Sequence, residues 1–151
     1  MLQPPLSRAR RLVTAVMLAA ACSDIAGTTT VKVSLVVVAN RHAMPGEQQP
    51  PAQAVVGPRS ITIRATSFLP QSGYEFGPKL QIKGNKEARL LQVEVLARER
   101  DGIDFVWRYD YEVRLSDVPP GSYIVVLLRR DEPPLGQPSP REELRQTVTV
   151  P

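Results

Sequence analysis

Three observations predict that this chain is all-β, a single antiparallel β-sandwich of about seven strands. Every second residue from Ile103 to Leu115 is apolar or aromatic, which is the period of a strand with one buried face. Turn signals rich in glycine and proline recur at short intervals. Amphipathic helical periods longer than a few turns are missing, so a packed pair of sheets is the economical interpretation.

The centre of the prediction is a hairpin between residues 88–99 and 103–115, joined by a three-residue loop at 100–102. This register sets apolar side chains opposite one another and brings opposite charges together. A loop of this length places its third residue, Gly102, at positive φ. The expected pairs are Ala97 with Phe105, Val95 with Trp107, Val93 with Tyr109, Leu91 with Tyr111, Arg98 with Asp104, and Glu94 with Arg108.

A turn and a third central strand follow. Pro120 and Gly121 fit the second and third positions of a type II turn, which requires positive φ at the glycine. From Tyr123 to Leu128 the next strand is apolar on both parities. Such a strand is expected to be buried on both faces or central in its sheet.

The run from Asp104 through Val118-Pro119-Pro120-Gly121-Ser122-Tyr123 to Val125 resembles the late hairpin of known sandwich domains. These are the prealbumin-like (carboxypeptidase regulatory-like) domains and related immunoglobulin-like domains. The resemblance covers about a third of the chain after residue 21, and it implies a sandwich of that kind. It also implies that the Tyr123 hydroxyl bonds back to upstream backbone, as in a tyrosine corner.

Residues 1–21 are expected to be a signal peptide. Arg8, Arg10 and Arg11 precede an apolar run, 12–21, that ends in small residues and is too short to span a bilayer. The following Cys22, the sole cysteine, resembles the lipidated cysteine of bacterial lipoproteins, although Ala19 stands where that family usually has leucine. Ser23 after it resembles outer-membrane sorting. The alternative is cleavage that leaves Cys22 as an unlipidated thiol in a soluble periplasmic or secreted protein.

Removal of the signal changes the charge balance. The chain has 19 Lys and Arg against 15 Asp and Glu, and the loss of three signal arginines leaves 16 against 15. A nearly neutral domain lacks the basic face that nucleic-acid binding needs, so we expect no nucleic-acid partner. Residues 22–27 are expected to form the lipidated N-terminus and tether, and 28–151 the sandwich domain.

Within that domain, strands are expected over 28–38, 59–69, 79–83 and 146–150, with one helical turn at 141–144. Residues 39–58 are expected to form a long Pro-rich loop, either a functional loop or a mobile one. Residues 71–78 are expected to form a second loop or irregular edge that carries Tyr74 and Phe76.

The residue inventory argues against catalysis, so we expect no enzyme, no cofactor and no metal site. His42 is the only histidine, which is too few for a nitrogen-rich metal site or a Ser-His-Asp site with its glycine-framed serine. Asp110 and Glu112 share a face with arginines and are expected to be ion-paired rather than to form an acid/base pair. Asp131, Glu132, Glu142 and Glu143 lack the ligand spacing of a calcium loop.

The aromatic row Phe105, Trp107, Tyr109 and Tyr111 has two interpretations. It is either core or, if exposed, a platform for a sugar ring or a partner. The function expected is a non-catalytic envelope lipoprotein, exported and anchored through lipid on Cys22 to the outer membrane, facing the periplasm or the cell surface. It would act as a structural or protein-interaction module for another envelope protein. The alternative is a carbohydrate- or peptide-binding module that uses Tyr74, Phe76 or Trp107.

Overall fold

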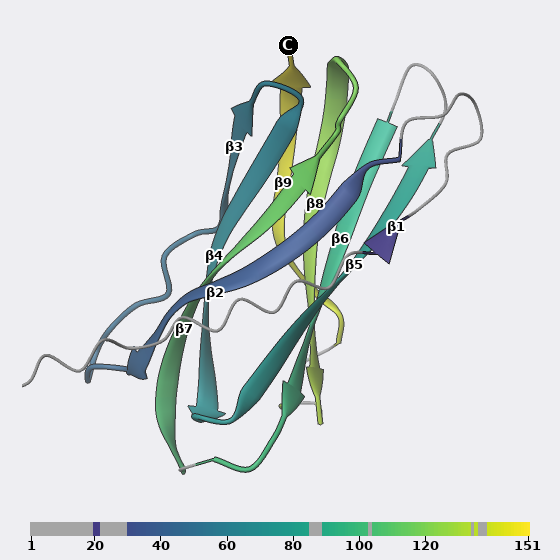
Figure 1. Cartoon of the computed structure of the whole chain (residues 1–151). Helices are drawn as coiled ribbons and strands as arrows, with labels where there is room; N and C mark the ends of the chain where they lie inside the picture. Colours follow the sequence, from purple (N-terminus) through teal and green to yellow (C-terminus); the bar gives the residue numbers. More distant parts are fainter. Residues whose placement is uncertain (1–19, 22–29, 85–88, 103, 134, 136–138) are drawn as a thin grey trace, which may run out of the picture.

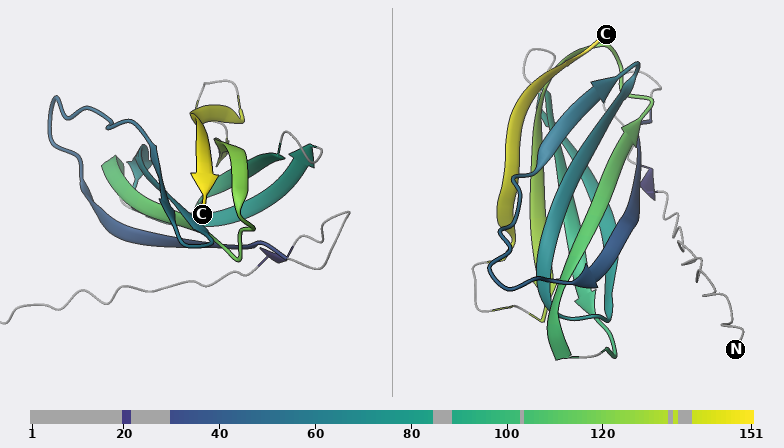
Figure 2. Two further views of the ribbon diagram at one scale, coloured as in Figure 1. Left: turned by 90° about the horizontal axis from the view of Figure 1, so that it is seen from above. Right: turned by 90° about the vertical axis from the view of Figure 1, so that its left-hand side faces the viewer.

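The structure, a computed structural model, describes residues 20–21, 30–84, 89–102, 104–133, 135 and 139–151. Within these ranges the chain forms strands and no helix, and the strands stack in two layers (Figures 1 and 2). The strands are β1 (Ala20–Ala21), β2 (Lys32–His42), β3 (Gln53–Gly57), β4 (Ser60–Gln71), β5 (Tyr74–Gly84), β6 (Arg89–Glu99), β7 (Asp104–Ser116), β8 (Gly121–Glu132) and β9 (Arg141–Val150).

Eight long strands are divided equally between two sheets, which confirms the predicted all-β sandwich. The first sheet has the order β2-β7-β4-β3, and the two-residue β1 is added at the outer edge of β2. The second has the order β5-β6-β8-β9. The alternating apolar faces of both sheets point inward, so the core lies between the layers.

One strand pair departs from the antiparallel prediction. β6 and β8 are neighbours in the second sheet and run parallel, with Leu91 opposite Val125 and Val93 opposite Leu127. The strand between them in sequence, β7, belongs to the first sheet. The chain therefore reverses direction twice between β6 and β8, so these two strands run the same way in the second sheet.

The predicted hairpin is wrong. β6 pairs with β5 and β8, whereas β7 pairs with β2 and β4. The apolar faces of β6 and β7 do meet, but across the sandwich core and not side by side in one sheet. The alternation of apolar residues in these strands was correctly predicted, but the same alternating pattern also fits strands other than the neighbour in sequence. The charges are accordingly paired elsewhere, Arg98 with Glu132 (3.3 Å), Glu94 with Arg130 (2.9 Å) and Arg108 with Glu47.

Gly102 also differs from its prediction, because the glycines at positive φ are Gly46, Gly84 and Gly121. Gly102 is required for a different reason. A Cβ at this position would collide with the backbone of Gly73 in the β4–β5 turn, and a Cβ on Gly73 would collide with the backbone of Asp101. The connection from β6 to β7 crosses between layers, and its backbone packs directly on the neighbouring turn.

Two predicted loops are partly strand. β2 extends to His42 and β3 covers Gln53–Gly57, so the irregular parts of 39–58 are 43–52 and Pro58. β5 begins at Tyr74 and places Pro78 in an edge strand, where a missing N–H is tolerated. Residues 141–144 belong to β9 and form no helical turn. Each of these segments is held by long-range pairing that local composition does not reveal.

The third central strand behaves as expected. β8 lies inside its sheet, between β6 and β9. Gly121 has φ 144°, which is positive as predicted but far from the value of about +80° that a type II turn has at this position. The Tyr123 hydroxyl donates a hydrogen bond to the Pro119 carbonyl oxygen at 2.7 Å, which is the bond to upstream backbone that the resemblance implied.

Candidate functional site

The aromatic row of β7 is divided between core and surface. Tyr109 and Tyr111 are buried, Trp107 is half-buried, and Phe105 is 60% exposed. The core interpretation therefore holds for Tyr109 and Tyr111, whereas Phe105 has the exposure that the platform interpretation requires. The strand leaves the core at the end of the sandwich that carries the β4–β5 turn and the β6–β7 connection (Figure 1).

At this end of β2 and β7 lie five residues that we call the aromatic tip: His42, Met44, Phe105, Val106 and Trp107. Val106 alternates with Phe105 and Trp107 along β7, so its side chain faces the other side of the sheet. The His42 ring centroid lies 4.4 Å from that of Trp107 and 5.4 Å from that of Phe105. Met44 is 65% exposed and Val106 is 56% exposed. The Trp107 Nε1 is buried and has no hydrogen-bond partner among the described residues. The tip therefore combines closely packed, mutually tilted rings with exposed apolar side chains.

Sequence reasoning placed His42 in a loop as a solvated residue. The structure places it at the end of β2, directly opposite Trp107 in the register of β2 with β7. Its side chain is exposed, as expected, but its ring packs against those of Trp107 and Phe105 at tilted angles of 58° and 32°. His42 and Trp107 are brought together by the pairing of two strands that lie more than sixty residues apart in the sequence. No local sequence pattern predicts such a pairing.

Tyr74 and Phe76 lie in β5 and face the core. Tyr74 is only 8% exposed and packs edge-on against Tyr109, with ring centroids 6.3 Å apart. Phe76 lies between Tyr109 and Tyr111, at 5.2 and 5.3 Å. Of the three aromatic contacts that the sequence suggested, only Trp107 lies at the tip.

Next to the tip, Glu47 fixes the loop 43–52 to the first sheet. Its carboxylate accepts hydrogen bonds from the guanidinium groups of Arg41 (3.0 Å to Nη1) and Arg108, and from the Met44 backbone N–H at 2.9 Å. Hydrogen bonds from Arg41, from the Met44 backbone and from Arg108 lower the pKa of Glu47 to about 2. Arg108 also pairs with Asp110 at 2.9 Å. The position of Met44 at the tip thus depends on a charged anchor.

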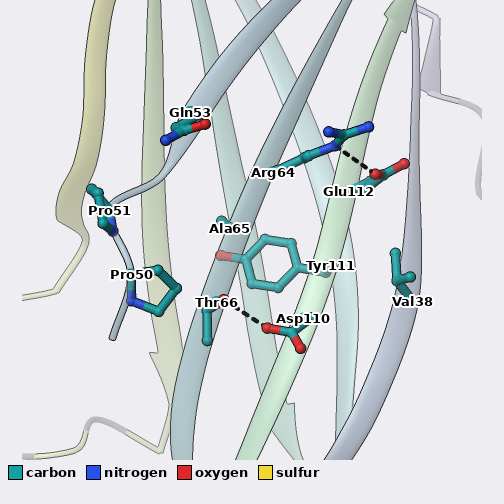
Figure 3. A pocket seen from close by; sticks show the side chains of 10 residues that line it. All are labelled: Val38, Pro50, Pro51, Gln53, Arg64, Ala65, Thr66, Asp110, Tyr111 and Glu112. Carbon is teal, nitrogen blue, oxygen red and sulfur yellow. Dashed lines mark hydrogen bonds and ion pairs between the residues drawn. The ribbon is translucent and has the colours of Figure 1, made fainter. Parts of the chain in front are cut away.

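A shallow pocket of about 270 Å³ lies between this loop and the outer face of the first sheet. Figure 3 shows Pro50 and Pro51 on one side, Val38 on the other, and two polar pairs beneath. Arg64 pairs with Glu112 at 2.9 Å, and the Thr66 hydroxyl donates to Asp110 at 2.7 Å. Because these groups already satisfy one another, the pocket offers a ligand little beyond its apolar walls.

A buried polar network lies inside the sandwich. Arg129 of β8 forms ion pairs with Asp131 (3.0 Å) and Glu143 (3.1 Å) and donates to the Ser67 hydroxyl at 2.5 Å. The Tyr111 hydroxyl donates to Glu143 at 3.1 Å. Burial, followed by the Glu143 charge, raises the pKa of Tyr111 above its ordinary value. Glu143 also pairs with Arg141 at 3.0 Å. With both acids already paired with arginine, the network is suited to holding the layers in register.

The other predicted acidic candidates are also paired with arginine. Glu132 contacts Arg98, and Glu142 contacts Arg145 at 2.7 Å. In the part of the chain that the structure describes, no group of three or more His, Cys, Asp or Glu could hold a metal ion. Cys22, the predicted lipidation site, lies outside the described residues, as does Ile103 of the aromatic row.

A search for a membrane-spanning helix among the described residues finds none of sufficient length and apolar character. Comparisons with known proteins add no relative, since no family model, no curated protein and no solved structure matches this chain.

Proposed function

We propose that this protein is an exported, lipid-anchored and non-catalytic interaction module whose contact surface is the aromatic tip. The observation that carries the proposal is the exposure of Phe105, Val106 and Met44 together at one end of an otherwise well-packed sandwich. Exposed apolar side chains that cluster in this way usually mark a binding surface. The signal-like N-terminus and Cys22 supply the expected address.

The position of the tip along β2 supports an outward-facing role. The expected tether, 22–27, leads into the start of β2 near Lys32, whereas His42 lies at the far end of the same strand. Eleven residues at about 3.3 Å each separate these ends by roughly 35 Å. A protein anchored through Cys22 would then present the tip away from its own membrane. Cleavage before Cys22 would also remove β1 and leave the eight long strands intact.

The chemistry of the tip favours another envelope protein as the partner. Aromatic residues, methionine and arginine are enriched in protein interfaces. The tip supplies two aromatic rings and Met44, and Arg41 and Arg108 lie beside it on the Glu47 anchor. We therefore expect the partner to present an apolar surface flanked by acidic groups that can face these arginines.

A carbohydrate partner is the second candidate. It is favoured by the neighbouring rings of His42, Phe105 and Trp107, of which His42 and Phe105 are exposed. Exposed ring faces can pack on the apolar faces of sugars. Unlike the protein candidate, this one needs no extended apolar contact through Met44 and Val106.

The experiment is in-cell photo-crosslinking of the full chain with a photoreactive amino acid at Val106, followed by mass spectrometry. The matched control carries the same group at Val55, an exposed residue of β3 outside the tip. A protein adduct at position 106 that is absent at position 55 supports the main proposal. A glycan adduct, with a shift of tryptophan emission on adding that glycan, supports the alternative. Equal labelling at both positions, or none at position 106, contradicts both.

A further inference from the structure

The outer edge of β2 differs from the other sheet edges. Edge strands expose backbone donors and acceptors, and proteins discourage strand addition there with short strands, proline, charges or bulges. β3 is five residues long and is tied to β9 by Gln146, which exchanges hydrogen bonds with the Ala54 backbone at 3.2 and 3.3 Å. β5 carries Pro78 between charged residues. β9 carries a bulge and four charged residues in its first five.

β2 has few such features over its middle. From Val33 to Val37 the strand is uncharged and, apart from Ser34, aliphatic, and its register with β7 is regular until the irregularity after Val37. Among the described residues, only Ala20 and Ala21 pair with this outer side, opposite Val33 and Lys32. β1 thus shows that the edge accepts an antiparallel strand, and the segment from Ser34 to Val37 lies beyond its reach.

We propose that two copies of the mature chain associate by pairing the outer edges of their β2 strands antiparallel, around a two-fold axis at Leu35. This register places Val33 opposite Val37 and Ser34 opposite Val36 of the second copy. Inward-facing side chains therefore stay on the inward face, so the two first sheets become one continuous sheet with a shared aliphatic face.

Charge also favours this register. Lys32 falls opposite the uncharged Val38 of the second copy and is already neutralised by Asp117 of its own chain at 2.9 Å. Arg41 lies beyond the paired segment, on the Glu47 anchor. No like charges are brought together, which would otherwise oppose a homodimer.

The inference rests on the proposed function in one respect, the removal of Ala20–Ala21 with the signal. Val33 cannot pair with Ala20 and with Val37 of a second copy at once, so β1 and the second copy exclude each other. Export and cleavage would therefore release the dimer edge. The paired segment is short, so we expect a small interface and weak association between the two copies. Anchoring both copies in one membrane would raise the effective concentration of each for the other.

The test is disulfide crosslinking in membranes from cells that express the full chain with Ser34→Cys and Val36→Cys. These positions face each other across the proposed axis, and oxidation is expected to give a covalent dimer. The matched control carries Gln53→Cys and Val55→Cys, the same spacing on the β3 edge. Dimer from the first variant and not from the second supports the proposal. Dimer from neither, or equally from both, overturns it.

Two further variants make the result decisive. Val36→Lys, made without the introduced cysteines, should weaken association of the two copies by at least about tenfold, because it places one lysine of each copy near the two-fold axis. Analytical ultracentrifugation measures the association, and the circular dichroism spectrum should remain that of the parent. The intact mass shows whether Ala20–Ala21 were removed. If they are retained, the proposed processing fails, but Ala21→Pro, which disrupts β1, must then restore the dimer. Absence of the dimer in the Ala21→Pro variant as well would overturn the inference.

Discussion

Gly73 and Gly102 lie backbone against backbone, so closely that a Cβ on Gly102 would overlap the Gly73 amide nitrogen. The Arg100 amide donates to the Gly73 carbonyl at 2.5 Å in the same contact. This contact packs the connection that crosses between the layers on the β4–β5 turn, directly beside the aromatic tip.

Gly102→Ala should therefore destabilise the protein by about 1–3 kcal/mol, because the new methyl group overlaps backbone that cannot rotate away. The measurement is urea denaturation followed by circular dichroism. Gly77→Ala is the matched control, since a Cβ there meets no atom within 4 Å, and it should leave the midpoint nearly unchanged. Equal effects of the two substitutions would show that the contact is not tight.

This contact also shows where sequence reasoning stopped. The glycine at 102 was noticed and given a local reason, positive φ in a hairpin loop, whereas the structure gives a non-local one. The alternation of β7 and the positive φ at Gly121 were predictable because side-chain parity and turn chemistry are properties of neighbouring residues. Partner choice was not predictable, because β5, β7 and β8 all offer β6 an apolar face.

The same limit applies to the candidate site. β3 follows Pro50 and Pro51 in a stretch with loop composition, and only its pairing with β4 makes it a strand. The tip joins His42 to Trp107 through the pairing of β2 with β7. Tyr74 and Phe76 looked like loop aromatics because Gly73, Gly77 and Pro78 surround them. Gly73 lies in the β4–β5 turn, and the edge position of β5 tolerates Gly77 and Pro78.

Glu47 predicts an acid-sensitive loop. Its folded pKa, about 2, lies below the ordinary 4.5, so its contribution to stability is present above pH 4.5 and is lost as the pH falls toward 2. Thermal melts across this range should fall more steeply for the parent than for Glu47→Gln. Glu112→Gln, which removes the carboxylate of an exposed ion pair, is the control and should keep the parental slope. Identical slopes for the parent and Glu47→Gln would contradict the anchor.

The tyrosine corner can be tested by Tyr123→Phe. Loss of the hydroxyl removes the bond to the Pro119 carbonyl, along with the 3.1 Å hydrogen bond from Arg89, at a cost of about 1 kcal/mol. Ser122→Ala, at the exposed neighbouring position, should change the free energy of unfolding by less than about 0.5 kcal/mol. Urea denaturation measures both variants. A neutral Tyr123→Phe would mean that the turn is fixed by Gly121 and its prolines alone.

The tyrosines predict an alkaline limit to stability. Burial raises the pKa of Tyr74 to about 12, aided by the charges of Glu99 and Asp131, and burial also raises the pKa values of Tyr109 and Tyr111. Because the folded values exceed the ordinary 10.0, the stability is full below pH 10 and is lost as the pH rises above it. Ultraviolet titration should show three of the four tyrosines ionising late in the folded protein and near pH 10 in urea. Early ionisation of all four would place these rings in solvent.

Arg129 makes the sharpest stability prediction, because its neighbour in sequence is a natural control. Its side chain is 2% exposed and faces Asp131 and Glu143, so Arg129→Ala leaves the buried Asp131 carboxylate without its cation and, among the described residues, leaves Glu143 paired only with Arg141. Breaking such a group typically costs about 3–5 kcal/mol. Arg130 points to the opposite face, is 39% exposed and pairs with Glu94 alone at 2.9 Å, so Arg130→Ala should cost less than about 1 kcal/mol. Urea denaturation of the two variants separates these values. Similar costs would mean that water reaches Asp131 and Glu143, and that the layers are held together by their apolar clusters rather than by this network.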